Sequence, residues 1–139
     1  MAQAGGDKLK IGYWKFRGVH RGNGSRYLLA YTGAQWEEQN FTMGDDSWPT
    51  FKSGGTIGEF PNLPFIIDGD VKVTETFAVH RYICDKFKPE LLGTTPAEKA
   101  RIMQLYSVAD DKFIKSLVTL VFKDGVTREQ VNEAALGAL

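Results

Sequence analysis

The side chains most often used in catalysis or metal binding are scarce in this chain. It has two histidines, His20 and His80, and one cysteine, Cys84. Two histidines without carboxylates or cysteines at ligand spacing are too few for a metal cluster. Cys84 stands among apolar residues at helical spacing, which favours the core over nucleophilic chemistry, and it cannot form an internal disulfide. The sequence therefore predicts no metal site.

Three short segments have residue types that could bind or activate a small polar ligand. Glu75 and Thr76 stand at the predicted start of a helix, where unpaired N–H groups and the positive end of the dipole attract an anion. An ordinary helix cap is the alternative. The pair Leu63-Pro64 could present backbone to a ligand or simply open a strand. Tyr13 lies near the end of the first predicted strand, where periodicity alone favours a tyrosine packed into the core.

These residues need an α/β framework to position them, and the hydrophobic pattern predicts one. The predicted elements are strands at 9–14, 36–42, 65–68 and 71–74, and helices at 25–32 and from Thr76 to a point before Pro89. Segment 44–58, rich in Gly, Ser, Asp and Pro, is predicted as loop with one short helix. A right-handed parallel crossover and a closing antiparallel hairpin give a mixed four-stranded sheet with helices on its faces.

A helical part follows the predicted sheet domain. The organisation that we expect is a tail at 1–8, a sheet domain at 9–88, a linker at 89–95 and a partial helical domain at 96–139. Thr95, Pro96 and Glu98 mark the start of a helix that is predicted to run to about Phe122. Thr127 offers a capping-box start for a last helix. Two helices cannot bury both of their apolar faces alone, so this domain is expected to be incomplete.

Composition and charge exclude several classes of partner. Lys plus Arg equals Asp plus Glu at 17 each, without a long basic run, which argues against nucleic acid and anionic membranes. No apolar stretch approaches the roughly 18 residues of a membrane-spanning helix. The N-terminus lacks the patterns of a signal or transit peptide, and with a single cysteine this favours a reducing, cytoplasmic compartment.

Five motifs in register resemble the glutathione transferase family, and three of them look specifically like its Mu class. The motifs are Ile11-Gly12-Tyr13-Trp14 with Arg17-Gly18, Tyr31-Thr32-Gly33, Phe41-Thr42-Met43-Gly44-Asp45 with Trp48, Phe60-Pro61-Asn62-Leu63-Pro64, and Thr74-Glu75-Thr76. They extend over roughly residues 9–123. The resemblance implies a thioredoxin-like N-terminal domain followed by an all-α domain, with glutathione as co-substrate and no metal.

The resemblance implies that Tyr13 is the catalytic tyrosine. A thiol has an unperturbed pKa above neutrality, and a hydroxyl that donates to the thiolate lowers that pKa. Hydrogen bonds to a charged partner are worth roughly 1.5–3 kcal/mol, which corresponds to about one to two pKa units.

The same resemblance assigns the other parts of glutathione to residues of this chain. Leu63, in a turn with a cis proline, would pair its backbone with the cysteinyl part, and Asp111, or its neighbour Asp110, would reach the γ-glutamyl amine bound in the other subunit of a dimer. The full set of implied glutathione-binding residues is Trp14, Trp48, Lys52, Asn62, Leu63, Glu75, Thr76 and Asp111.

Two departures from the family pattern bear on activity. Residues 19–24 are about two residues longer than the Mu-like pattern, and Gly22 and Gly24 disfavour helix there. The family's helical domain also continues well beyond residue 139 and supplies most of the wall for the electrophile. Two hypotheses follow: a glutathione transferase, or a non-catalytic relative that acts as an interaction module in a larger assembly. The absence of cysteine in the first turn excludes a thiol-disulfide oxidoreductase.

Overall fold

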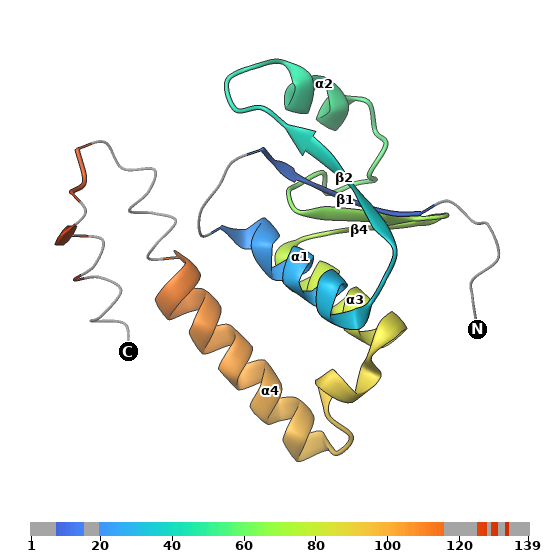
Figure 1. Ribbon diagram of the computed structural model, residues 1–139, viewed down its shortest axis with the longest axis vertical. Helices are drawn as coiled ribbons and strands as arrows, with labels where there is room; N and C mark the ends of the chain where they lie inside the picture. The colour runs from blue at the N-terminus through green and yellow to red at the C-terminus, as the bar shows by residue number, and fades with distance from the viewer. Residues whose placement is uncertain (1–7, 16–19, 116–124, 128, 131–132, 134–139) are drawn as a thin grey trace. The chain divides into compact units, whose positions relative to one another are not determined.

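Four short strands form a mixed sheet in the order β2-β1-β3-β4 (Figure 1), as the hydrophobic pattern predicts. The strands are β1 Leu9–Trp14, β2 Trp36–Phe41, β3 Phe65–Asp68 and β4 Val71–Thr74. β1 runs parallel to β2, whereas β3 is antiparallel to both β1 and β4. The predicted crossover and hairpin are therefore both confirmed. β2 lies at one edge of the sheet, as expected from its polar sequence.

This computed structural model describes residues 8–15, 20–115, 125–127, 129–130 and 133. The chain divides into two compact units, Met1–Leu91 and Leu92–Leu139. The first unit contains the sheet. No described helix is both long and apolar enough to cross a membrane.

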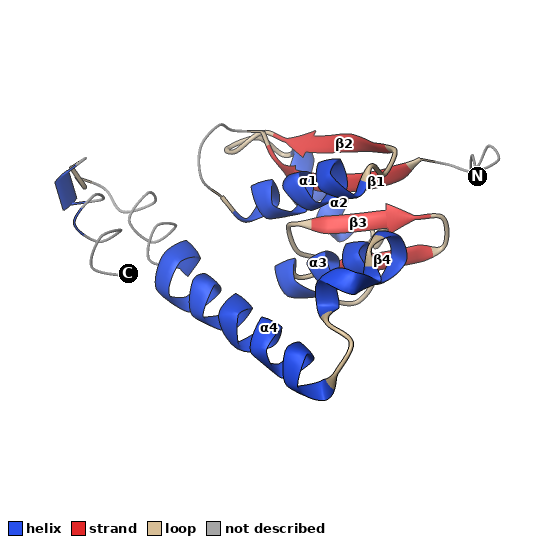
Figure 2. Ribbon diagram, turned by 60° about the horizontal axis from the view of Figure 1, so that its bottom comes forward, coloured by secondary structure: helices blue, strands red, loops and turns tan. Residues whose placement is uncertain are grey.

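Helices cover both faces of the sheet. α1 (Arg21–Thr32) and α3 (Thr76–Phe87) lie side by side on one face, and the short α2 (Ser47–Ser53) lies on the other (Figures 1 and 2). The core between the sheet and the two long helices consists of fully or almost fully buried aliphatic side chains, namely Leu9, Ile11, Leu29, Ile66, Val79 and Ile83. Cys84 of α3 is buried, as expected.

The first helix begins four residues earlier than predicted. Segment 22–24 is part of α1, although its two glycines have low helix propensity. A Cβ at Gly22 would lie 2.5 Å from the Tyr13 ring, and one at Gly24 would lie 2.7 Å from the His80 ring. Glycine at these positions lets α1 approach β1 and α3 closely. Tertiary packing thus outweighs local propensity, and the sequence prediction of a loop here was wrong.

A second, more aromatic core lies around the end of β1. It consists of Tyr13, Phe41, Ile57, Leu63 and Phe65, all at most 9% exposed. Side chains of α2 pack against it from the far face of the sheet. This core includes the predicted site residues Tyr13 and Leu63, and Trp14 and Trp48 pack against it.

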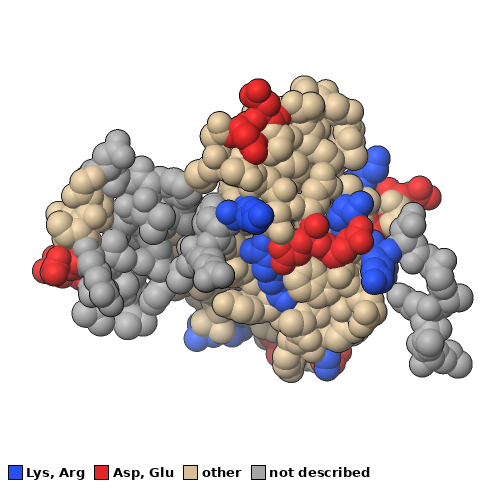
Figure 3. Space-filling model, turned by 45° about the horizontal axis from the view of Figure 1, so that its top comes forward, with Lys and Arg blue, Asp and Glu red and all other residues tan. Residues whose placement is uncertain are grey.

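Acidic and basic side chains lie beside one another on the face shown in Figure 3. In the first unit, Arg26 pairs with Glu38 across α1 and β2 at 2.8 Å, and Lys10 pairs with Glu37 at 3.4 Å. Such interspersed charges agree with the neutral composition. Because exposed ion pairs contribute little to stability, the apolar cores supply most of the stability of the fold.

The first α-helix of the second unit is α4 (Pro96–Val108), which has the cap that the sequence predicts. The Thr95 hydroxyl accepts from the Glu98 N–H at 3.2 Å, and Glu98 Oε2 accepts from the Thr95 N–H at 3.0 Å. The helix continues as a π-helical turn, η2 (Ala109–Ile114). The reciprocal cap at Thr127 and Gln130 is also present. The predicted continuation to Phe122 and most of the last helix lie outside the described residues.

Candidate functional site

The register of the sheet brings two predicted site residues to the same end of it. Gly12 of β1 pairs with Phe65 of β3, and Phe65 pairs with Thr74 of β4, so these three residues form one row. Tyr13 follows Gly12, and Glu75 follows Thr74. Because β1 and β4 run in the same direction on either side of β3, both residues lie just beyond this row.

Gly12 has a packing role in that row. A Cβ at this position would lie 2.1 Å from two carbons of the Phe65 ring, which is fully buried. The ring therefore lies directly over the glycine backbone. A glycine before the tyrosine lets β1 and β3 pair while Phe65 fills the core beneath the site.

Tyr13 is 7% exposed, and its ring stacks on the ring of His20 with centroids 4.9 Å apart and planes 10° apart. Burial raises the pKa of the Tyr13 hydroxyl. This effect outweighs the opposing charge of Arg21 and the hydrogen bonds from the backbone N–H groups of Arg21 and Gly22. The hydroxyl oxygen thus meets the first turn of α1 and stays protonated at neutral pH, as a hydrogen-bond donor must.

The turn before β3 has the conformation that the sequence resemblance implies. The Leu63–Pro64 peptide bond is cis. Leu63 is buried at 9% exposure beside Tyr13 in the aromatic core, and its N–H donates to its neighbour Asn62 at Oδ1, at 2.9 Å. The Asn62 side-chain nitrogen in turn donates to Glu75 Oε1 at 2.7 Å. This pair of hydrogen bonds joins the turn to the start of α3.

Glu75 adopts a backbone conformation that is unfavourable for an L-residue. Its φ is 70°, and among the described residues it is the only non-glycine with a positive φ. Such strain persists only where surrounding contacts hold it, and it is frequent at ligand sites. Glu75 makes no side-chain capping bond to α3, so it does not act as an ordinary helix cap. Thr76 is the first helical residue and is half-buried.

The two predicted tryptophans meet at the edge of the aromatic core. Trp14 ends β1, and Trp48 lies in the first turn of α2, with ring centroids 6.1 Å apart in an edge-on arrangement. The rings of Trp48 and Phe41 also pack together, with centroids 5.1 Å apart. Lys52, one helical turn after Trp48, is exposed. Phe41 therefore anchors α2 to the end of β2, which carries Trp48 and Lys52 toward the same end of the sheet.

Asp111 belongs to the other compact unit. It lies in η2 and forms an ion pair with Lys115 at 2.7 Å. Its predicted contact with glutathione across a dimer stays a prediction.

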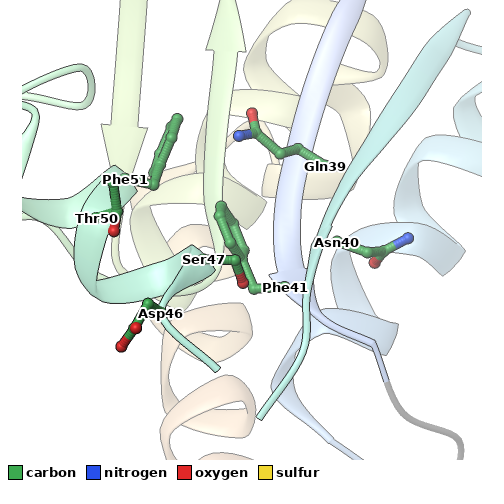
Figure 4. A pocket seen from close by; sticks show the side chains of 7 residues that line it. All are labelled: Gln39, Asn40, Phe41, Asp46, Ser47, Thr50 and Phe51. Carbon is green, nitrogen blue, oxygen red and sulfur yellow. The ribbon is translucent and has the colours of Figure 1, made fainter. Parts of the chain in front are cut away.

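A pocket of about 550 Å³ lies between β2 and α2 (Figure 4). None of the predicted glutathione residues lines it. In Figure 4, Phe41 and Phe51 face its interior, whereas the Asn40 side chain lies across β2 from α2. Asn40 is engaged there with Glu38 and Arg26. The candidate site is therefore defined by the turn geometry at the sheet end rather than by this pocket.

The sequence analysis missed His20 and Gly22 as neighbours of Tyr13. It considered His20 only as a metal ligand and placed both residues in a loop. No periodicity marks a stacking partner; the available signal was a histidine and two glycines in a segment longer than the family pattern. Among the described residues, no group of three or more His, Cys, Asp or Glu side chains could hold a metal ion.

Comparison with solved structures supports the fold. The chain superposes on the crystal structure of a nematode-specific glutathione transferase of C. elegans with a TM-score of 0.72 and 26% identity, over 94% of this chain and 62% of the other.

Comparison of sequences points to the same proteins. The class-mu 26 kDa glutathione S-transferase isozyme of Schistosoma mansoni is 44% identical over 99 residues, which are 69% of this chain and 47% of the relative. Glutathione S-transferase Mu 4 of Mus musculus is 40% identical over 110 residues, 74% of this chain and 48% of the relative. The chain spans about half the length of these curated relatives. The family of glutathione S-transferase N-terminal domains matches residues 9–85, more than half of the chain, and so this protein belongs to the glutathione S-transferase family.

Proposed function

We propose that this protein binds glutathione at the end of its sheet and conjugates it to an electrophile, with Tyr13 stabilising the thiolate. The observation that carries the proposal is the common row of Gly12, Phe65 and Thr74. This row sets Tyr13 and Glu75 at one end of the sheet.

The proposed roles follow from the chemistry of each group. A protonated Tyr13 can donate to a thiolate but gains nothing from a thiol as acceptor, so its hydrogen bond favours the charged form. The turn at Leu63 offers backbone groups to the cysteinyl part of the tripeptide. The N-terminus of α3, with Glu75 and Thr76, favours the γ-glutamyl carboxylate, and a carboxylate at Glu75 suits the amine. Trp48 and Lys52 suit the glycine carboxylate, for which Lys52 supplies a cation, and Trp14 is a neighbouring residue of the site.

The bound geometry requires two hydrogen bonds of the free protein to change. The Leu63 N–H donates to Asn62, and Asn62 also donates to Glu75. A glutathione carbonyl that pairs with the Leu63 N–H would replace the Asn62 oxygen, and the γ-glutamyl amine would compete for Glu75. Asn62 is exposed, so its side chain is free to turn away.

The remaining assignments extend this proposal to the whole chain. Residues 9–88 would form the glutathione-binding domain, and residues 96–139 part of a helical domain. Leu105 and Val108 of α4 are 52% and 53% exposed, which suits a surface that a second copy of the chain covers. Asp111 would then complete the partner's glutathione site. A reducing, cytoplasmic environment suits the buried thiol of Cys84.

Titration calorimetry with glutathione tests binding, and ultraviolet absorbance of the bound thiolate against pH tests the role of Tyr13. Tyr13→Phe is expected to leave the affinity almost unchanged and to raise the bound-thiol pKa by about one to two units. Tyr31→Phe, at an α1 position that is 65% exposed, is the matched control and should change neither quantity. Absence of binding at millimolar glutathione, or an unchanged thiol pKa in Tyr13→Phe, would contradict the proposal.

A non-catalytic interaction module is the second candidate, and two observations favour it. The Tyr13 hydroxyl is buried against backbone N–H groups of Arg21 and Gly22, and the Leu63 N–H is already engaged. If calorimetry shows no glutathione binding while sedimentation shows a stable assembly, this candidate is favoured. If the chain binds glutathione with a shifted thiol pKa, the transferase is favoured.

A further inference from the structure

We propose that His20 is a positioning residue for Tyr13: its ring, stacked on the phenol, holds the hydroxyl in the orientation that meets the sulfur of glutathione. This inference rests on the proposed function. It concerns a segment that is longer here than in the family pattern, and it gives that segment a role in the site.

The first step is the contact itself. The two rings are nearly parallel, at 10°, with centroids 4.9 Å apart, and His20 is only 4% exposed. A buried aromatic ring stacked flat on another restricts its rotation and tilt. Tyr13 pairs with Asn40 of β2 but lies one residue beyond the last pair of β1 with β3, so backbone pairing supports it on one side only and the His20 ring helps to orient its side chain.

The second step is the fit of α1 against the same tyrosine. A Cβ at Gly22 would lie 2.5 Å from Tyr13 Cγ and Cδ1 and 3.1 Å from its Cβ. The helix can reach this position only because residue 22 is glycine. His20 and Gly22 thus lie against one phenol ring from two positions on either side of Arg21, at the start of α1.

The third step is what holds His20 in place. Its carbonyl accepts from the Asn23 N–H at 3.1 Å, and Asn23 Oδ1 accepts from Arg26 at 3.3 Å. Arg26 binds both carboxylate oxygens of Glu38 on β2, at 2.8 and 3.1 Å. Burial raises the pKa of Glu38, but hydrogen bonds from Arg26 and Asn40 and the nearby His20 outweigh it and hold that pKa low. A chain of contacts therefore ties His20 to the sheet.

The charged groups around Tyr13 also belong to this helix start. Arg21 and Arg26 both favour the phenolate, while burial opposes it. A stacking ring at position 20 keeps the hydroxyl near these groups. We therefore predict that a flat ring at position 20 is what orients Tyr13, and that the acid–base chemistry of histidine is not needed for it.

Two substitutions separate ring shape from other effects. His20→Phe keeps a flat ring that can stack. His20→Asn removes the ring but supplies a favourable N-cap residue for α1, so the start of the helix is preserved. Ile83→Val, in the other core, is a control for modest loss of stability without contact to Tyr13.

The full chain is titrated with glutathione, and the ultraviolet absorbance of the bound thiolate gives its pKa in each variant. We expect His20→Asn to raise this pKa by about 0.5 unit or more, which is about a threefold loss of thiolate at fixed pH below the pKa. His20→Phe and Ile83→Val should stay near wild type. Aromatic NMR spectra, with Tyr13 assigned by Tyr13→Phe, should show changed ring-proton shifts in His20→Asn.

The outcomes distinguish this inference from the proposed function. If Tyr13→Phe raises the thiol pKa but His20→Asn does not, His20 has only a structural role and the inference is overturned, while the proposed function stands. If His20→Asn and His20→Phe raise it equally, stacking is not the cause and the inference is also overturned. If Tyr13→Phe has no effect, the proposed function fails and this inference falls with it.

Discussion

Gly12→Ala is expected to disrupt the row of residues beneath the candidate site. The new Cβ would lie 2.1 Å from Cε1 and Cζ of Phe65. Ordinary carbon contacts are about 3.5–4.0 Å, so the ring must withdraw by roughly 1.4 Å or more. Phe65 is fully buried, and the ring of Phe51 stacks on it at 5.2 Å, so little room exists for that movement. The expected loss is about 3 kcal/mol, at the upper end of overpacking costs.

Urea unfolding followed by tryptophan fluorescence measures this loss. All three tryptophans lie at residues 14, 36 and 48, within the first unit, so the signal reports the sheet domain. With an m-value of about 1–3 kcal/mol/M, the midpoint for Gly12→Ala should fall by about 1 M or more. Glutathione affinity should fall with it, since the row positions Tyr13 and Glu75.

Gly54→Ala is the matched control for this substitution. Gly54 has a helical φ of −70°, and a Cβ there would meet nothing closer than 3.4 Å. Its stability should change by less than about 0.5 kcal/mol or increase slightly. Phe65→Leu should partly relieve the Gly12→Ala defect in a double-mutant cycle. Equal midpoints for Gly12→Ala and Gly54→Ala would refute the packing argument.

Two further predictions concern polar contacts, one within the first unit and one within the second. Burial raises the pKa of Tyr82, and the hydrogen bond from its hydroxyl to Asp68 raises that pKa further, to about 12. Asp68→Asn should therefore lower the pKa of Tyr82 toward 10, as measured by tyrosine titration. Burial raises the pKa of Asp68 itself, but hydrogen bonds from Lys86 and Tyr82 outweigh it and leave that pKa low. The carboxylate therefore stabilises the fold fully at pH values above about 4, the pKa of an unfolded Asp. In urea titrations, the difference in stability between wild type and Asp68→Asn should vanish as the pH falls through the pKa of Asp68 in the folded protein. Hydrogen bonds from the backbone N–H of Thr95 and from the side chain and backbone N–H of Thr94 hold the pKa of Glu98 at about 2. Thr94→Ala removes one of these donors and should raise that pKa in carboxyl NMR titrations, whereas an unchanged pKa would contradict this contact. Thr95→Ala removes the hydroxyl that caps the Glu98 N–H and should lower helix content by circular dichroism.

Local sequence patterns were sufficient to predict the strands, the hairpin and the α4 cap. Each depends on neighbours in the chain: alternation of apolar residues over a few positions, a Gly-Asp turn between two strands, or a Thr and Glu three residues apart. The site residues Tyr13, Leu63 and Glu75 came from motifs in register with a family rather than from periodicity. Their assignment to glutathione stays a prediction.

Only the tertiary structure decided the conformation of residues 20–24. From local propensity, Gly22 and Gly24 predict a loop, because glycine loses the most backbone entropy in a helix. In the folded protein, the Tyr13 and His80 rings occupy the space where Cβ atoms would stand, so glycine is what allows α1 to start at residue 21. The stack of His20 on Tyr13 and the hydrogen bond from Asn62 to Glu75 likewise join residues 7 and 13 positions apart. Such contacts depend on packing between elements, which no local pattern in the sequence records.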